Sequence, residues 1–195
     1  MAAAACVALA AGAMSSAAPA SAAEVSDPVA TGLHMPLQIQ VTWSGSVLVG
    51  DADRVARVRA DGQVSDLVTD DGVDGVAAGR YGRVFYTRTQ QPGVAQIRVR
   101  RPSGALRTVA DLAAYEAAHN PDKGNRYGLQ GLTPECADQV PEDFRDHPGG
   151  IDSHPYALAR THRGLLVADA GGNDILLVNS KGIRTVAVLD RKSVV

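Results

Sequence analysis

Six charged or imidazole residues of this chain stand beside short apolar runs. His34, Asp74 and His154 each precede such a run, and three others each follow the next run along the chain: Asp51, Arg88 and Asp169. Imidazole and carboxylate groups that meet around one axis could bind a divalent metal ion or polarise a bound ester. These six residues are therefore the candidate ligand-binding set.

The same residues also have a structural interpretation, which the local sequence favours. An aspartate that follows a strand often accepts hydrogen bonds from the backbone of the next turn, and Asp169 opens the hairpin-like segment 169–174. Asp169 and Asn173 are consequently weak candidates for metal ligands. His154 precedes Pro155, which holds it in an extended segment, so a hydrogen bond to a neighbouring unit is its favoured role.

Motifs that identify common enzyme mechanisms are missing from the sequence. It has no Gly-x-Ser-x-Gly elbow, no His-Glu-x-x-His pair, no phosphate-binding loop and no Gly-x-Gly-x-x-Gly before a helix. The sequence therefore favours binding over catalysis.

Three segments repeat one pattern of apolar runs and turns, and they must position the candidate residues. They span 37–68, 75–110 and 156–188, and each reads as four short strands. Gly62, Gly104 and Gly182 occupy the same turn between the third and fourth strands, where glycine provides the positive φ of a tight hairpin. The second strand of each repeat is continuously apolar, so we expect it to be buried on both faces.

Four strands per repeat of about 40 residues predict an all-β fold, the β-propeller. We expect three four-stranded blades, at about 33–69, 73–110 and 153–189, from a six-bladed ring. Because propellers close with four to eight blades, three blades indicate a C-terminally truncated product. The alternative is a domain that closes its ring as a homodimer.

The segment 111–152 interrupts the repeats. Its first residues, 111–118, have high helix propensity and are followed by Asn120 and Pro121, so we expect one short helix there. The rest is rich in Pro, Gly, Asp and Glu. A long insertion of this kind is usually functional, and we expect a lid over one propeller face.

The first 23 residues are rich in alanine and end in an Ala-x-Ala cleavage site at residues 20–22. They predict a secretory signal peptide, an extracellular or periplasmic protein, and a mature domain of residues 24–195 without a membrane span. Cys136 is then the one cysteine that remains. Its disulfide partner lies beyond this chain, or it is a buried free thiol.

The charges of the chain are nearly balanced, with 19 Lys and Arg against 21 Asp and Glu. Arg98, Arg100, Arg101 and Arg107 cluster in one repeat, but they lie at alternating strand positions and in a turn, as on a solvated outer face. No basic patch with interleaved aromatic residues is present, so nucleic acid is not an expected partner.

Four motifs resemble the ScyD/ScyE family of exported bacterial proteins, whose members are longer than this chain. They are DLAAYEAAHNPD at 111–122, DSHPYA at 152–157, VADAGGND at 167–174 and TVAVL at 185–189. The resemblance implies a fold like that of the NHL and gluconolactonase-type six-bladed propellers. Gluconolactonase-type enzymes use calcium, which makes Ca²⁺ a cofactor that the resemblance raises for this chain.

Three classes of function follow from these observations. The favoured one is an exported propeller that binds a small molecule or a protein partner through its central channel face. The alternatives are a metal-assisted lactonase or sugar oxidoreductase of the propeller type, which rests on fold analogy, and a non-functional truncated fragment.

Overall fold

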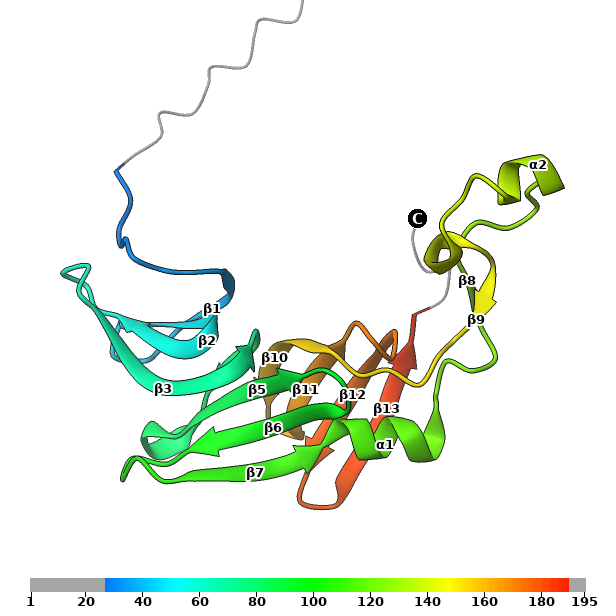
Figure 1. Cartoon of the computed structure of the whole chain (residues 1–195). Helices are drawn as coiled ribbons and strands as arrows, with labels where there is room; N and C mark the ends of the chain where they lie inside the picture. The colour runs from blue at the N-terminus through cyan, green and yellow to red at the C-terminus, as the bar shows by residue number, and fades with distance from the viewer. Residues whose placement is uncertain (1–26, 190–195) are drawn as a thin grey trace, which may run out of the picture.

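The computed structural model describes residues 27–189, which fold mainly into antiparallel sheets (Figure 1). The predicted signal peptide lies outside the described residues. Within residues 27–189, no helix is long and apolar enough to cross a membrane.

The second and third repeats each form a four-stranded sheet whose strands follow one another in sequence order. The second sheet has the order β4-β5-β6-β7, with strands β4 (Val76–Ala78), β5 (Val84–Gln90), β6 (Val94–Arg100) and β7 (Leu106–Asp111). The third has the order β10-β11-β12-β13, with strands β10 (Pro155–Thr161), β11 (Gly164–Asp169), β12 (Asp174–Asn179) and β13 (Gly182–Val188). Gly104 and Gly182 have φ of 87° and 115°, as the hairpin turns require.

The first repeat has three strands where four were expected, which corrects the sequence prediction. They are β1 (Pro36–Val41), β2 (Val47–Val58) and β3 (Val64–Val73), paired in that order. Residues 47–51 of β2 pair with β1, and residues 52–58 pair with β3. The link after Asp51 is too short for a separate loop, so one long strand with Ala52 at φ 59° replaces the expected second and third strands.

Apolar side chains fill the space between neighbouring sheets. One cluster joins the first sheet to the second through residues such as Val55, Val73 and Tyr86. A larger one joins the second sheet to the third and includes Ile97 and Leu176. The second strands are less deeply buried than expected, because their central residues Phe85 and Leu166 are only half-buried.

The first strands of the three sheets, β1, β4 and β10, are edge strands that lie beside one another. The Gln38 side chain on β1 forms hydrogen bonds with the backbone of both β4 and β10. Its Oε1 accepts from the backbone N–H of Val76 at 2.7 Å and of Leu158 at 3.0 Å, and its Nε2 donates to the Leu158 carbonyl at 2.8 Å. One amide group therefore links all three sheets.

A second polar contact joins the outer strand of the first sheet to the second sheet. Asp70 on β3 accepts hydrogen bonds from the Tyr86 hydroxyl and from the guanidinium groups of Arg88 and Arg98. Burial alone would raise the pKa of Asp70, but these hydrogen bonds and the charge of Arg98 lower it below its usual value. The carboxylate therefore stays ionised at neutral pH.

The insertion contains more regular structure than its composition predicts. Its elements are α1 (Leu112–His119), β8 (Arg126–Tyr127), α2 (Pro134–Ala137), a 3₁₀ turn (Glu142–Phe144) and β9 (His147–Pro148), with another 3₁₀ turn (Arg80–Gly82) in the second repeat. Helix α1 confirms the predicted helix to within one residue, and the side chain of Asp111 caps it by accepting from the Ala114 N–H.

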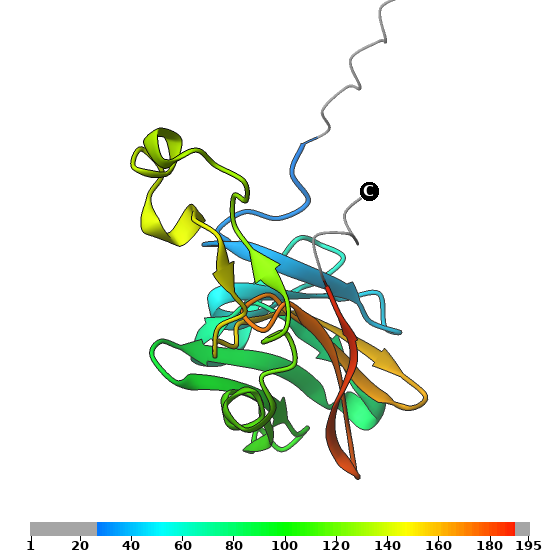
Figure 2. The same ribbon diagram turned by 90° about the vertical axis from the view of Figure 1, so that its right-hand side faces the viewer.

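The part of the insertion after α1 projects beyond the ends of the sheets in both views, so it does not form the expected lid (Figures 1 and 2). Cys136 lies on α2 as an exposed free thiol, which corrects the prediction of a buried one. A disulfide partner beyond this chain stays a prediction. Trp43, in the turn between β1 and β2, is also fully exposed.

We expect Gln38→Ala to lower the free energy of unfolding by about 2–3 kcal/mol, because it leaves backbone groups of β4 and β10 without partners. Urea denaturation followed by circular dichroism measures the loss. The matched control is Gln63→Ala, since Gln63 is exposed and bonds only within its own hairpin. Equal stability of the two variants would contradict the role given to Gln38.

Candidate functional site

The first strand of each sheet is fixed at its start by the side chain of a residue on the second strand. In the first sheet, Oδ1 of Asp51 accepts from the backbone N–H of His34 and of Met35, both at 2.8 Å. In the third sheet, Asp169 accepts from the His154 N–H and the Ser153 hydroxyl. These aspartates tether the start of the first strand to the second strand, which the sequence did not predict. Asp169 also accepts from the N–H groups of Gly171 and Gly172, the turn contacts that were predicted.

Thr87 holds the equivalent place in the second sheet, which sequence reasoning had assigned to Arg88. The Thr87 hydroxyl accepts from the N–H of Asp74 at 3.1 Å and of Gly75 at 2.8 Å. Arg88, one residue later, points to the other face of its strand and pairs with Asp70. The structure therefore does not bring Arg88 together with the other five candidates.

Two of the six candidates meet across the boundary between the second and third sheets. Nε2 of His154 lies 3.0 Å from Oδ2 of Asp74, and the His154 ring stacks on Tyr156 with centroids 4.3 Å apart. His34, by contrast, faces solvent and contacts Asp53 at 3.2 Å. The ligand-binding role of these residues stays a prediction. The contact of His154 with Asp74 on the neighbouring sheet agrees with the other role considered for His154, a structural hydrogen bond between units.

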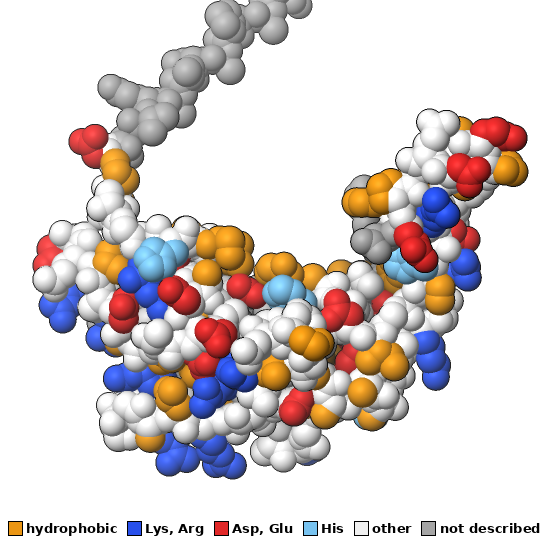
Figure 3. All heavy atoms as spheres, viewed as in Figure 1, with side chains coloured by type: hydrophobic (Ala, Val, Ile, Leu, Met, Phe, Trp, Pro, Cys, Tyr) orange, Lys and Arg blue, Asp and Glu red, His pale blue; other side chains and the backbone are white. Residues whose placement is uncertain are grey.

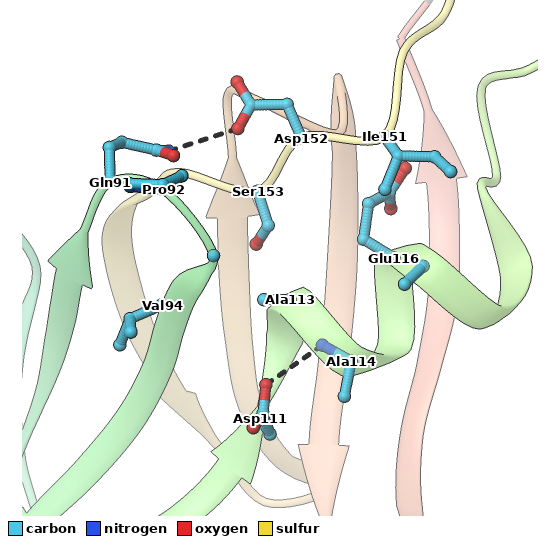
Figure 4. A pocket seen from close by; sticks show the side chains of 12 residues that line it. Gln91, Pro92, Val94, Asp111, Ala113, Ala114, Glu116, Ile151, Asp152 and Ser153 are labelled. Atoms are coloured by element: carbon cyan, nitrogen blue, oxygen red, sulfur yellow. Dashed lines mark hydrogen bonds between the residues drawn. The ribbon is translucent and has the colours of Figure 1, made fainter.

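A pocket of about 460 Å³ lies between the second sheet and α1, and its lining includes Ser153, the residue before His154. The β5–β6 turn, α1 and residues 151–153 form its walls (Figure 4). Gln91 donates to Asp152 at 3.2 Å and so joins two of these walls. The lining includes three carboxylates and no Lys or Arg: Asp111, Glu116 and Asp152.

Glu116 connects this pocket to a group of buried carboxylates behind it. Its neighbours are Asp122, Asp169 and Asp174, and none of the four residues is more than 3% exposed. Burial is the largest cause that raises the pKa of Glu116 to about 7, and the charges of Asp122, Asp169 and Asp152 add to it. The pKa of Asp174 also rises to about 7, through burial and then the charges of Asp169, Glu116 and Asp122.

Sequence reasoning missed Glu116, Asp122 and Asp174 as a group. One signal was available in α1, because Glu116 follows Leu112 by four residues and so shares the helix face that packs on the sheets. A glutamate on that face must be buried. The positions of Asp122 and Asp174 depend on how the insertion returns to the third sheet, which the sequence pattern does not define.

The metal candidates named from the sequence have other partners. Oδ1 of Asp169 accepts from the N–H groups of Gly171 and Gly172 as well as His154, while Oδ2 accepts from Ser153. The Asn173 side-chain amide donates to Oδ2 of Asp122 at 2.9 Å. Across residues 27–189, no three His, Cys, Asp or Glu side chains are grouped so that they could hold a metal ion by themselves.

Charge is unevenly distributed over the face drawn in Figure 3. Histidine and many acidic side chains lie over its middle and upper part, whereas most Lys and Arg side chains lie lower or at the sides.

No family model matches the sequence, and a comparison with curated proteins finds no match. Among solved structures, the chain is similar to virginiamycin B lyase from Staphylococcus aureus, with 18% identity, a TM-score of 0.39, and coverage of 82% of this chain and 57% of that one. A streptogramin B lyase structure has 15% identity and a TM-score of 0.37, covering 78% and 54%.

A third solved structure, a putative oxidoreductase (glucose dehydrogenase) from Thermus thermophilus, has 14% identity and a TM-score of 0.32, with 84% and 87% covered. These neighbours are propeller-like proteins. This chain spans little more than half the length of the two lyases. At these values the likeness transfers neither activity nor site residues.

The buried carboxylates make stability depend on pH in a defined direction. The pKa of Glu116 rises from an ordinary 4.5 to about 7, so the folded state binds this proton more tightly than the unfolded state does. Its stabilising effect is complete below pH 4.5 and is lost as the pH rises to 7.

In metal-free buffer, we therefore expect the free energy of unfolding to fall across this interval, by up to about 1.4 kcal/mol per pH unit for each such group. Glu116→Gln removes one titrating group and flattens the fall, whereas Glu142→Gln, at an exposed position, leaves it unchanged. Urea titrations at several pH values measure both slopes. The expectation would be refuted if the free energy of unfolding of the parent protein rose from pH 5 to 7 in the same way as that of Glu116→Gln.

Proposed function

We propose that this chain is an exported, propeller-type binding protein whose pocket between α1, the β5–β6 turn and residues 151–153 takes a small organic cation. One observation carries the proposal: the pocket is lined by Asp111, Glu116 and Asp152 and by no Lys or Arg. A ligand with a positive charge would offset the carboxylates that the fold has collected there.

The rest of the lining defines the body of such a ligand. Pro92, Val94 and Ile151 contribute apolar surface, and the exposed side of α1 in the pocket carries only alanines: Ala113, Ala114 and Ala117. Small side chains on a helix leave room for a flat or chain-like group to approach the backbone. The pocket therefore suits an amine with an apolar body of modest size.

The wider architecture belongs to the same proposal. Three consecutive antiparallel sheets, stacked through apolar cores and fixed by equivalent tethers at one end, support an arrangement as three blades of a six-bladed ring. Membership of the ScyD/ScyE family, export after removal of residues 1–23, and binding of a protein partner are further proposals. Leu37, Ile39 and Val41, exposed along β1, support association with a partner or a second copy.

Benzylamine is a suitable first probe, and benzoate is the matched probe of opposite charge. We expect isothermal titration calorimetry on the full chain to detect benzylamine but not benzoate. Asp152→Asn should weaken benzylamine binding roughly tenfold, because it removes a charge-assisted contact worth about 1.5–3 kcal/mol.

Asp138→Asn is the control, since Asp138 is exposed on the projecting part of the insertion. Equal binding of benzoate, or unchanged affinity in Asp152→Asn, would show that the carboxylates do not select the ligand.

The proposed export has a direct test in the sequence of the secreted product. Cleavage after the Ala-x-Ala site should leave an N-terminus at Ala23 or Glu24. N-terminal sequencing of protein recovered from the medium or periplasm reads this end. Recovery of the protein from the cytoplasm with Met1 intact would count against export.

A further inference from the structure

Two adjoining pockets lie at the ends of β1, β4 and β10, away from the side chains that fix the starts of these strands. One, of about 560 Å³, lies between the β1–β2 turn and the 3₁₀ turn Arg80–Gly82. The other, of about 550 Å³, lies between the β1–β2 turn and the β10–β11 turn. Because Thr42, Trp43 and Arg80 line both pockets, the two form one depression across three sheets, which we call the turn groove.

The turn groove carries positive charge that no acidic side chain of its lining balances. Among the described residues that line it, none is Asp or Glu, and four are arginines: Arg57, Arg80, Arg83 and Arg160. None of the ion pairs within residues 27–189 involves any of these arginines. The amine pocket has the opposite lining, with three carboxylates and no Lys or Arg. A ligand that complements the turn groove would therefore be negatively charged.

Two aromatic side chains extend into solvent beside these arginines. Trp43 is fully exposed and Tyr81 is 85% exposed. Tyr81 also has φ of 57°, a left-handed backbone conformation that is strained for a bulky residue. Strain of this kind persists mainly at binding and active sites, where it holds a side chain in a required position. The 3₁₀ turn therefore presents the Tyr81 ring as a contact surface.

The same end of the sheets can accommodate a long ligand. A third pocket, of about 440 Å³, is lined by Arg163, Lys181 and Arg184 and also contains no Asp or Glu among its described residues. It adjoins the turn groove along the chain, because Arg163 follows His162, which lines the groove. The positive surface therefore extends from the first sheet to the third.

We propose that the turn groove binds an acidic oligosaccharide, a chain of sugar rings that bear carboxylates. Guanidinium groups match carboxylates in charge and in bidentate geometry. Trp43 and Tyr81 offer flat apolar faces to the sugar rings. Thr42, Ser44 and Thr161 line the groove as well, and their hydroxyls can donate to and accept from those of a sugar.

Single-stranded nucleic acid is the other polyanion to consider for such a surface. Proteins that bind it stack successive bases on successive aromatic side chains. In the described lining of the turn groove, Trp43 and Tyr81 are the only Trp, Tyr or Phe residues, and hydroxyl side chains occupy the positions between and beside them. This lining favours a sugar chain over a row of bases.

This inference goes beyond the proposed amine pocket, with which the turn groove shares no residue. Either site can therefore fail its test without affecting the other. The sequence gave no sign of the turn groove because its arginines come from three different repeats: Arg57 from the first, Arg80 and Arg83 from the second, and Arg160 from the third.

Titration of the full chain with tetragalacturonate tests the proposal, with maltotetraose as the neutral probe of equal length. We expect calorimetry to detect tetragalacturonate but not maltotetraose, with an affinity that falls as the NaCl concentration rises. Trp43 is the only tryptophan of the chain and lines the groove, so its emission should change as a sugar ring covers it. A short oligothymidylate of equal charge is the nucleic-acid probe and should bind more weakly.

Arg80→Gln should weaken tetragalacturonate binding roughly tenfold, because it removes a charge-assisted contact from the centre of the groove. Trp43→Ala should weaken it severalfold through the loss of the stacking face. Arg107→Gln is the matched control, since Arg107 is exposed on β7 and lies outside both pockets. All three positions are exposed, so urea denaturation should show unchanged stability.

Three results would overturn the proposal. The first is no binding of tetragalacturonate, or equal binding of maltotetraose, which would show that the arginines do not select the ligand. The second is an equal loss of affinity in Arg80→Gln and Arg107→Gln, which would indicate attraction to the whole surface and not to the groove. The third is equal or tighter binding of the oligothymidylate, which would overturn the assignment to a sugar chain.

Discussion

The structure depends on how the unpaired edges of three strands are satisfied where the sheets meet. Each of β1, β4 and β10 pairs on one side only, and an unpaired edge buried among other strands would leave backbone groups without partners. The Gln38 amide meets this demand by serving as donor and acceptor at once. Gln40, two residues further along β1, makes a similar contact, because its Oε1 accepts a hydrogen bond from the Ala78 N–H at 2.6 Å.

The side chains that fix the starts of β1, β4 and β10 differ in charge from sheet to sheet. Asp51 and Asp169 use a carboxylate at a position where the second sheet uses the neutral hydroxyl of Thr87. The Asp74 side chain is itself buried near Thr87 and bonds to His154. A third carboxylate at this place would add like charge beside Asp74, whereas threonine gives the same backbone contacts without that cost.

Local signals in the sequence were sufficient for much of the fold. Glycines at positions 104 and 182 and the alternating strands identified the second and third sheets, and Asp111 with the alanine-rich run that follows it identified α1. The first sheet differed because the link after Asp51 is so short that two expected strands became one. The partners of Gln38 and Arg88 could not be predicted, since they lie between 18 and 120 residues away in sequence and depend on how whole sheets pack.

The position of Trp43 has a consequence for spectroscopy. It is the only tryptophan of the chain, lies fully exposed in the turn between β1 and β2, and belongs to none of the apolar clusters of the described residues. An indole already surrounded by water in the native state changes its environment little when the sheets come apart. Its intrinsic emission would therefore remain almost constant through the transition, and tryptophan fluorescence would be a poor probe of unfolding, whereas the buried Tyr86 would change its surroundings.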